Sequence, residues 1–391
     1  MTAAPVLDLD LYEDAMLRDS REVFARIRAA GPVVWLPRHG MYAIGRFDDV
    51  RAALRDDAVF ASGSGVAANP LANRLSRDTT LASDGATHIT RRNVLKRSLA
   101  AGALAGIEEQ LDEHAGAVVE RLACGGEFDA ARDFASHLPV TVVAQLVGVR
   151  ADTQQLLRWG AAAFEALGPF NRRGRRATAA ALGMWLFARR LRAADVVPGS
   201  WAASVFEARD RGELTTREAK ALIIDFVGPS LDTTILASTH LLWLLGSNQE
   251  AWAQIRDEPE LIAAAIVENV RIASPVRGFT RRLTREHEVG GVALPAGARV
   301  ALLFGAANLD ESRFPEPERF DMRRESSVQL GWGNGAHTCV GLHLSKLEMQ
   351  ALLRAMLPRV RAVRVGRPRR LLNNTLQGIE HLPAWLAPAA A

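Results

Sequence analysis

Cysteine is scarce in this chain of 391 residues, which contains only Cys124 and Cys339. Two cysteines so far apart in sequence do not make a disulfide framework, and they favour a reducing compartment. The N-terminal segment also lacks the pattern of a secretory signal, because four acidic residues lie between positions 8 and 14, where an apolar core would be needed. We therefore expect a cytoplasmic protein.

Long apolar runs and tracts of one charge sign are also missing. No stretch reaches the roughly 20 apolar residues that cross a bilayer, and the run from Leu222 to Phe226 is interrupted by Asp225. The 48 Lys and Arg residues are interleaved with 44 Asp and Glu residues, so the net charge is only +4. This balance argues against the strongly basic surface of a nucleic-acid-binding protein. The sequence predicts a soluble chain with no membrane or nucleic-acid partner.

Helical periodicity dominates what is present. Apolar residues recur three and four positions apart in several Ala-, Leu- and Arg-rich segments, and this spacing predicts helices. The clearest segments are 104–122, 177–193, 215–245, 259–273 and 342–357. Segment 215–245 starts with a capping sequence and is mostly apolar further in, which is typical of the buried centre of a fold.

A smaller β portion is predicted towards the C-terminal end. Segment 289–304 carries β-branched residues with Gly-Gly and Pro-Ala-Gly turn signals, and a short β-like tail follows residue 357. Segment 308–341 is rich in Pro and Gly without periodicity, and such a long irregular stretch in a compact domain is usually functional. We find no repeat, linker or boundary, so residues 1–391 are expected to form one mainly α domain with a minor β portion.

The most informative segment is 331–341, which reads GWGNGAHTCVG and precedes a helix. Its four glycines permit a backbone that approaches a large flat group, with positive φ angles available. Cys339 lies just before the helix, where backbone N–H groups and the helix dipole favour a thiolate. A structural zinc site usually needs four ligands, whereas haem needs one protein ligand on this side. A buried free cysteine would be the ordinary interpretation of a lone cysteine without this glycine spacing.

This segment resembles the cysteine-ligand loop of cytochrome P-450 enzymes. The resemblance extends from about His88 to the C-terminus. It implies the cytochrome P-450 fold, with a long central helix over a haem b group, and Cys339 as the axial ligand of the iron. Gly333 would belong to the same loop. Trp332 replaces the usual Phe, and its indole would either pack beside the sulfur or donate a hydrogen bond to it.

Two further sets of residues match the family: an acid-base pair on a helix, and a set of contacts for the haem propionates. Glu268 and Arg271 lie three apart on a helix with apolar neighbours, so they can form a buried pair, although a surface pair would be the default. They look like the Glu-x-x-Arg signature of the family, and Arg319 would be their partner in a network that supports folding and haem loading.

Haem propionates need cations or hydrogen-bond donors. By resemblance, these contacts are His88 and Arg92, which lie four apart on one helical face, together with Arg281 and His337. Each of these residues by itself could be a solvated surface group.

The long helix contains Asp232 and Thr233 after a proline. Pro229 has no N–H, so the carbonyl of Asp225 loses its helical partner and the helix should bend there. The stretch resembles the oxygen-activating segment of the family. The match implies that Thr233 hydrogen-bonds the dioxygen and that Asp232 relays protons from solvent. Pro229 and Ser230 depart from the usual small residue and glycine at this point. From the residues alone, a kinked core helix with a polar patch is as good an interpretation.

The type of enzyme implied is a bacterial haem-thiolate monooxygenase that receives two electrons from an iron-sulfur ferredoxin and its NAD(P)H-dependent reductase. The chain is expected to contain no fused reductase or ferredoxin domain. Arg91, Arg97 and Lys346 would suit an acidic redox partner, or could be solvated charges.

Several segments look most like members that hydroxylate or O-demethylate small aromatic compounds. These segments are 164–171, 274–281 and 372–376. The expected pocket is compact and apolar, and its lining would comprise Phe164, Leu167, Val227, Gly228, Phe279 and Thr280. Benzoate enzymes hold a carboxylate with Arg and Ser on the long helix, and segment 223–228 has neither, so a neutral methoxyarene is favoured.

Three alternatives remain open. One is a tailoring hydroxylase that acts on a larger natural product. A second is a haem protein that binds or senses a ligand without turnover, which the acid-alcohol pair argues against. A hydrolase that uses Cys339 and His337 is weaker, because the sequence shows no oxyanion-hole element or third orienting residue.

Overall fold

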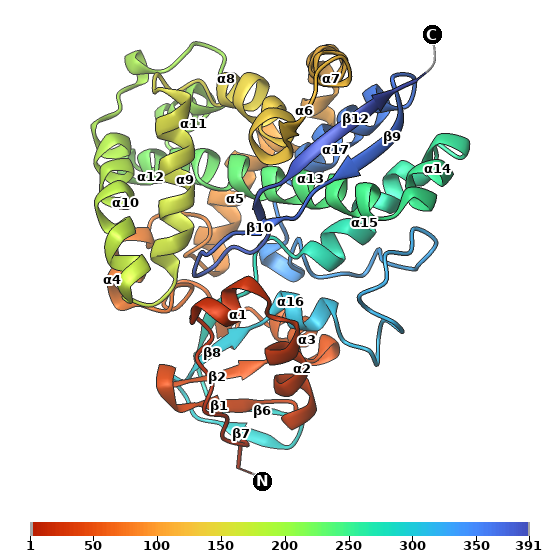
Figure 1. Cartoon of the computed structure of the whole chain (residues 1–391). Helices are drawn as coiled ribbons and strands as arrows, with labels where there is room; N and C mark the ends of the chain where they lie inside the picture. Colours follow the sequence, from red (N-terminus) through yellow and green to blue (C-terminus); the bar gives the residue numbers. More distant parts are fainter. Residues whose placement is uncertain (1–2, 390–391) are drawn as a thin grey trace.

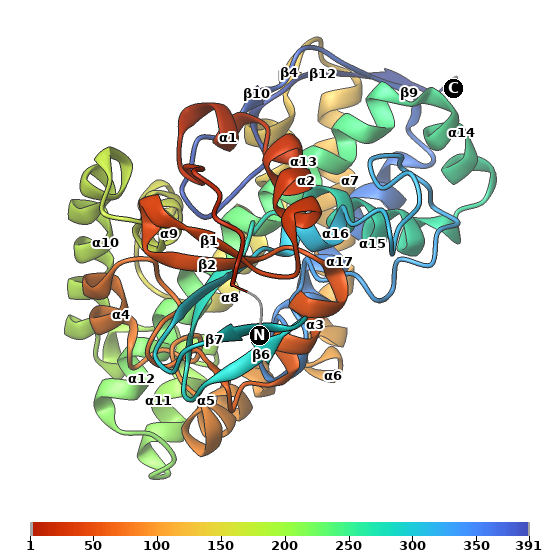
Figure 2. The same ribbon diagram turned by 90° about the horizontal axis from the view of Figure 1, so that it is seen from below.

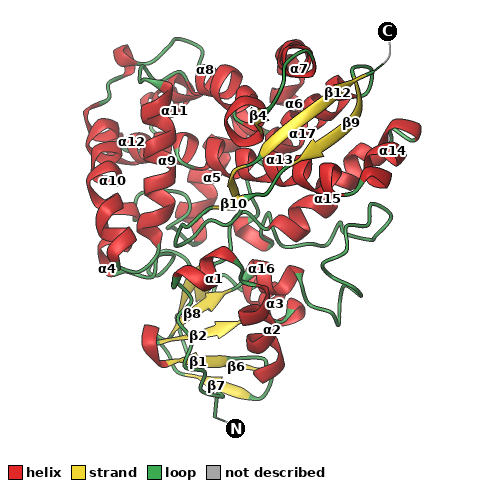
Figure 3. Cartoon of the chain, in the orientation of Figure 1, coloured by secondary structure: helices red, strands yellow, loops and turns green. Residues whose placement is uncertain are grey.

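Helices dominate the computed structural model, which describes residues 3–389 (Figure 3). The helices are, in chain order, α1 (Asp14–Arg18), α2 (Arg21–Ala30), α3 (Phe47–Arg55), α4 (Pro70–Ser76), α5 (Gly85–Leu99), α6 (Ala101–Leu104), α7 (Glu108–Ala123), α8 (Ala144–Val147), α9 (Thr153–Leu167), α10 (Arg172–Arg190), α11 (Trp201–Asp210), α12 (Thr216–Val227), α13 (Pro229–Ser247), α14 (Gln249–Asp257), α15 (Leu261–Ala273), α16 (Phe304–Asn308) and α17 (Leu342–Met356). Short 3-10 and π-type turns are η1 (Pro37–His39), η2 (Ala105–Ile107), η3 (Ala130–Ala135), η4 (Pro139–Val143), η5 (Ala193–Asp195) and η6 (Gly335–His337).

The largest sheet combines strands from both ends of the chain. It has the order β1 (Val34–Leu36), β2 (Met41–Ile44), β8 (Arg299–Leu302), β5 (Phe279–Leu283), β3 (Phe60–Ala61). Only β2 and β8 run parallel in it. The hairpin of β6 (His287–Val289) and β7 (Val292–Leu294) lies next to this sheet, and Figure 2 shows both in front of the helical body.

Two smaller sheets lie within the helical part. One joins β4 (Phe128–Asp129), β12 (Pro383–Pro388) and β9 (Val360–Val365), and the other joins β10 (Arg369–Arg370) and β11 (Ile379–His381). In Figure 1 the strands β9 and β12 cover one side of the helices, whereas the five-stranded sheet forms the opposite end of the molecule. The prediction of a mainly α fold with a minor β portion is confirmed.

Helices α12 and α13 follow one another through the middle of the helical part (Figure 1). A capping box starts α12: the Thr215 hydroxyl accepts from the Glu218 amide (3.2 Å), and the Glu218 carboxylate accepts from the Thr215 amide (2.9 Å). Gly228 closes α12 by donating to the Ile224 carbonyl (2.9 Å), and Pro229, which lacks an N–H, opens α13. By length and composition this pair of helices could cross a bilayer, but 56% of its most apolar window is buried inside the protein, as in a core helix.

The other predicted elements also lie where the periodicity put them. Segment 104–122 is mostly α7, 177–193 lies largely in α10, 259–273 is α15 from Leu261 onward, and 342–357 is α17. Segment 289–304 forms β7 and β8 before Phe304 starts α16. Within the described chain, segment 309–341 has no regular element except η6, so the whole connection between α16 and α17 is irregular.

Candidate active site

A large cavity lies between α5, α12, α13, β5 and the loop before α17. It holds about 1420 Å³ of empty space, counting the part that opens to solvent. Its wall carries Cys339 and Trp332 from the loop before α17 and Thr233 from α13. The cavity therefore brings the cysteine loop and the central helices to one space.

One face of the central helices lines this cavity. Asp225, Pro229, Thr233 and Ala237 are each four residues apart and all contribute to its wall, because positions four apart share a helical face. The hydroxyl of Thr233 donates to the Pro229 carbonyl (2.9 Å). Its oxygen lone pairs remain able to accept a hydrogen bond from a group in the cavity.

Asp232 lies on a neighbouring face of α13 and points towards α9. Its Oδ2 is buried without a hydrogen-bond partner in residues 3–389, and a Cβ placed on Gly160 of α9 would lie only 2.5 Å from it. Burial raises the pKa of Asp232 to about 7. A carboxyl group with such a pKa can take up and release a proton near neutral pH.

Cys339 faces the same cavity at the start of α17. Its amide donates to the Trp332 carbonyl (2.7 Å), and this bond closes a loop in which Gly333 and Gly335 have φ angles of +73° and +71°. A Cβ on Gly335 would lie 2.4 Å from the Leu54 carbonyl oxygen, so this position is restricted to glycine. The thiol is exposed to the cavity and enclosed by protein otherwise. This enclosure raises the pKa of Cys339, while the Gly341 amide and the charge of Arg92 lower it.

Trp332 does not use its indole N–H on the sulfur. The Nε1 atom donates to the Ser345 hydroxyl on α17 (3.2 Å), and the ammonium of Lys346 lies 5.1 Å from the ring centroid. The suggested hydrogen bond from this indole to Cys339 is therefore wrong, because the α17 hydroxyl takes the only donor that the ring has. The ring still lines the cavity.

Four cationic or ring N–H groups gather at another wall of the cavity. The rings of His88 on α5 and His337 on η6 lie 4.1 Å apart between centroids. Arg92 donates to the Thr338 carbonyl (2.5 Å), and Arg281 on β5 donates to the Thr280 carbonyl (2.9 Å). All four residues line the cavity.

This cluster is short of hydrogen-bond acceptors. The Nε2 atoms of His88 and His337 are both buried and find no partner within the described part of the chain. Asp84 is the nearest carboxylate to His337, at 3.9 Å from Nε2. Burial lowers the pKa of Arg281 to about 10, and it lowers the pKa of His337 to about 3 with help from Arg281 and His88. Such a wall fits a bound group that carries negative charge, and a haem has two carboxylates to offer.

Glu268 and Arg271 form a fully buried pair on α15. Arg271 donates twice to the Glu268 carboxylate (2.7 and 2.8 Å) and once to the Asn308 carbonyl (2.6 Å). The Ser326 hydroxyl donates to the same carboxylate (2.5 Å). The pair therefore attaches α15 to the irregular segment that leads to the cysteine loop.

The third member of this network is Arg324, and the prediction of Arg319 is wrong. Arg324 Nε donates to Glu268 Oε1 (3.1 Å) and is 11% exposed, whereas Arg319 pairs with Glu316 (3.2 Å) and is 66% exposed. The physical reason is a local turn in which the Arg319 amide donates to the Glu316 carbonyl. This turn places Arg319 at the surface, and the chain reaches Glu268 only a few residues later.

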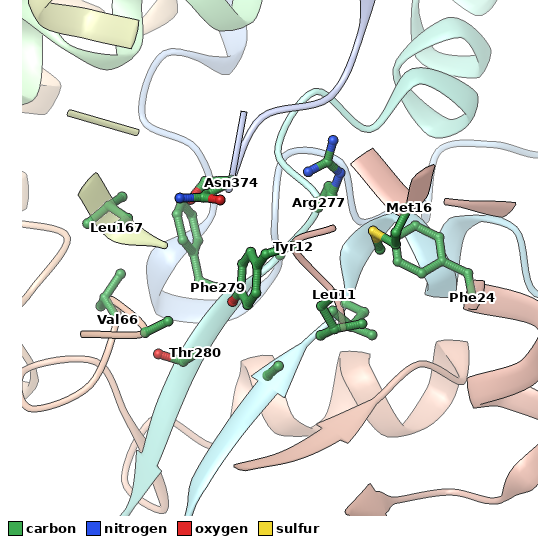
Figure 4. A pocket seen from close by; sticks show the side chains of 15 residues that line it. Leu11, Tyr12, Met16, Phe24, Val66, Leu167, Arg277, Phe279, Thr280 and Asn374 are labelled. Atoms are coloured by element: carbon green, nitrogen blue, oxygen red, sulfur yellow. The ribbon is translucent and has the colours of Figure 1, made fainter. Parts of the chain in front are cut away.

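The predicted substrate-pocket residues fall into three groups. Phe164 and Phe279 line the large cavity. Leu167 and Thr280 do not; together with Phe279 they line a smaller, separate cavity of about 470 Å³ of empty space, whose side chains Figure 4 shows.

Val227 and Gly228 line neither cavity, which corrects their expected place in the pocket. They lie between Asp225 and Pro229 on the helix and therefore point away from the lining face. Val227 is buried in the core beside α9 and α11, and the Gly228 carbonyl lies close to Gly160.

Two of the basic residues expected to meet a redox partner are already paired. Arg91 is 5% exposed and donates to Glu218 (3.0 Å) and to the Thr79 carbonyl (3.1 Å), so its expected availability at the surface is wrong. Arg97 is half exposed and pairs with Glu213. Their charges are taken up by these internal partners.

Asp225 and Thr80 were not singled out from the sequence. Both line the large cavity, and Asp225 Oδ2 accepts a hydrogen bond from the Thr80 amide (2.7 Å). Asp225 lies eight residues before Thr233, and this spacing alone would place it on the same helical face. No pattern in the sequence marks Thr80, because it lies in an irregular loop.

Comparisons with known proteins agree with this fold. A family model described as Cytochrome P450 matches residues 200–365. Cytochrome p450 CYP199A2 of Rhodopseudomonas palustris is 31% identical over 392 residues, which cover 98% of this chain and 95% of that protein. Linalool 8-monooxygenase of Pseudomonas putida is 28% identical, with coverage of 97% and 98%. The structure of full-length CYP116B46 from Tepidiphilus thermophilus superposes with a TM-score of 0.85 at 26% identity; the match covers 97% of this chain and 53% of that one.

A cysteine that faces a large cavity in a mainly α fold fits the class of haem-thiolate proteins, in which a cysteine thiolate holds the haem iron. The chain belongs to the cytochrome P450 family. It is a haem-thiolate monooxygenase, with haem as its cofactor.

Proposed function

We propose that this enzyme hydroxylates or O-demethylates a small, largely apolar aromatic substrate, with electrons from a separate ferredoxin and NAD(P)H-dependent reductase in the cytoplasm. The observation that carries the proposal is the shared cavity. It brings Cys339, the four groups His88, Arg92, Arg281 and His337, the hydroxyl of Thr233 and three phenylalanine rings to one space.

In this proposal Cys339 holds the haem iron, and the two histidines and two arginines hold the propionates. When bound, the haem supplies oxygen activation, which an axial thiolate promotes. The Nε2 atoms of His88 and His337 have no partner among residues 3–389 and could donate to carboxylates once the cofactor is bound. Glu268, Arg271 and Arg324 keep the irregular segment before the cysteine loop in place.

Thr233 and Asp232 would control protons. The Thr233 hydroxyl faces the cavity, and it would donate to dioxygen there after rotating away from the Pro229 carbonyl. Asp232 lies one residue earlier, away from the cavity and near Gly160. Its raised pKa suits a group that receives a proton on the α9 side and passes it towards the cavity.

The apolar part of the cavity supports a small aromatic substrate. Phe164, Phe279, Phe304 and Leu95 contribute rings and aliphatic surface, and aromatic ligands pack well against such groups. Relatives of similar identity are named for linalool and for oxidation of a steroid at C26, so identity at this level does not choose the substrate. The proposed substrate is therefore inferred from the residues that line the cavity of this chain.

Turnover of a methoxyarene tests the proposal. With dioxygen, two electrons and two protons, a methoxy group yields a phenol, formaldehyde and water. We expect haem-loaded protein with a surrogate ferredoxin and reductase to form phenol and formaldehyde in equal amounts. Protein with Cys339→Ser is the control and should lose the thiolate-type absorption of the reduced carbonyl complex. A panel of small methoxyarenes that neither changes the haem spin state nor gives product would contradict the substrate class.

A further inference from the structure

Asp225 is the single acidic residue among the described residues that line the large cavity. The positive groups of that cavity belong to the proposed propionate wall, formed by α5, β5 and η6, whereas Asp225 projects from α12. Eight residues separate it from Thr233, or about 12 Å of helix axis, which leaves room for one aromatic ring between them. Asp225 therefore lies where the far end of a small substrate would be.

The position of the Asp225 carboxylate is fixed by the loop that carries Thr80. Its Oδ2 accepts from the Thr80 amide (2.7 Å). The loop that carries Thr80 is in turn fixed by Arg91, which donates to the carbonyls of Arg77 (3.2 Å) and Thr79 (3.1 Å) while it pairs with Glu218. This arrangement keeps the acid at the cavity wall instead of letting it turn towards solvent.

The second oxygen of Asp225 is available to a ligand. Oδ1 accepts no hydrogen bond from residues 3–389, and the side chain is only partly covered. Burial raises the pKa of Asp225 to about 6, while the Thr80 bonds and the charge of Arg91 oppose the rise. At neutral pH the group is mostly a carboxylate, which is a strong hydrogen-bond acceptor.

A ligand that fills the cavity removes water from this oxygen. An apolar ligand would leave Oδ1 of this carboxylate desolvated and without a hydrogen-bond donor, which is unfavourable. A ligand carboxylate would add like-charge repulsion. A hydroxyl group at the same place would satisfy the oxygen with a charge-assisted hydrogen bond.

We propose that Asp225 determines the chemical class of the substrate: it selects an aromatic substrate with a phenolic hydroxyl at the end remote from the oxidised carbon, and it rejects a carboxylate at that end. This inference rests on the proposed function, since it assumes a small arene in the cavity. It assigns Asp225 to specificity and gives it no part in oxygen activation.

Three methoxyarenes that differ only in the para substituent test the inference on the haem-loaded protein: 4-methoxyphenol, 4-methoxytoluene and 4-methoxybenzoate. Binding is followed by the haem spin-state change and by calorimetry, so that no turnover is needed. We expect the phenol to bind at least about tenfold more tightly than the toluene, and the benzoate at least about tenfold more weakly than the toluene.

Two variants separate hydrogen bonding from charge. Asp225→Asn keeps an acceptor oxygen, so the phenol should retain part of its advantage while the benzoate gains at least about tenfold. Asp225→Leu removes the acceptor, so the advantage of the phenol over the toluene should disappear. Asp210→Asn on α11 removes the same charge from a side chain that is 64% exposed, and it should change no Kd by more than about twofold.

The outcomes distinguish this inference from the proposed function. If all three ligands bind the wild-type protein equally, or if Asp225→Leu leaves their order unchanged, the role of Asp225 is overturned and the small-arene function stands. If none of the three binds, the small-arene function fails and the inference fails with it. Thermal melting of each variant checks that the fold is retained.

Discussion

At the scale of single residues, Thr233 and Asp232 are adjacent in sequence but point to different surroundings. The Thr233 hydroxyl faces the cavity, whereas the Asp232 carboxyl is buried towards α9. Neighbouring residues on a helix are rotated by about 100° from each other. The two side chains therefore need separate tests.

Removal of the Thr233 hydroxyl should impair product formation. We expect Thr233→Ala to lower the product formed per electron pair at least about tenfold, because it removes the hydroxyl that would guide the proton. Thr233→Ser keeps the hydroxyl and should stay close to the wild type. Product and NAD(P)H consumption are measured together, and equal yields from the Ala and wild-type proteins would contradict a role for this hydroxyl.

Asp232 should make stability depend on pH. Its pKa is about 7 in the folded chain against 3.8 for an ordinary aspartate. Between these values the folded state binds more protons than the unfolded state, so stability falls as pH rises through this window. Asp232→Asn lacks this dependence on pH. The free energy of unfolding of the variant minus that of the wild type should therefore be about 2 kcal/mol larger at pH 8 than at pH 5. Denaturant unfolding at the two pH values measures the difference, and an unchanged gap would refute the buried, raised pKa.

At the scale of elements, the contact of α9 with α13 depends on Gly160. A methyl group there would lie 2.5 Å from Asp232 Oδ2 and 3.1 Å from the Gly228 carbonyl. We expect Gly160→Ala to lower the free energy of unfolding by about 1–3 kcal/mol and to slow turnover, since either the acid or the helix must shift. Gly102→Ala on α6, where nothing lies within 4 Å of the added carbon, should be neutral or slightly stabilising. Equal melting temperatures for the two variants would contradict this close packing.

The sequence predicted the elements better than it predicted the irregular segments. The 3.6-residue period placed α7, α10, α13, α15 and α17 because those helices have long apolar faces. The residues that line the cavity around Cys339 could be assembled from the family resemblance, and their roles remain predictions. Arg324 could not be told from Arg319, because both lie in a segment without periodicity, and only the turn at Glu316 decides between them.

The same helical period explains why two of the predicted substrate-pocket residues do not line the cavity. The prediction of Val227 and Gly228 rests on their position along the chain alone. Asp225 enters the sequence analysis as an interruption of an apolar run and as a backbone carbonyl before Pro229. Counting back from Thr233 in steps of four would have selected Pro229 and Asp225 instead. This information was present in the sequence, unlike the tertiary bond from Thr80.

At the scale of the whole molecule, the buried network at Glu268 connects the helical body with the segment before the cysteine loop. Arg324→Ala should lower the free energy of unfolding by about 1–3 kcal/mol, because Glu268 loses one of its two cationic partners in the interior. It should also reduce the fraction of purified protein that carries haem.

Arg319→Ala provides the matched control. Its ion pair with Glu316 is exposed, and the change should cost less than about 0.5 kcal/mol. The ratio of haem to protein absorbance, together with denaturant unfolding, compares the two variants. A larger loss of stability and haem content for Arg319→Ala than for Arg324→Ala would favour Arg319 as the third member of the network.

The face shared by Asp225, Pro229, Thr233 and Ala237 has a practical consequence for engineering. A library that varies only Asp225 and Ala237 would change two separate parts of the cavity wall. Asp232, which lies on another face of the helix near Gly160, would keep its surroundings. Substrate selectivity could then be altered while the proposed proton-relay residue stays as it is. Because the helix presents these residues on different faces, the cavity wall and the surroundings of Asp232 can be varied separately.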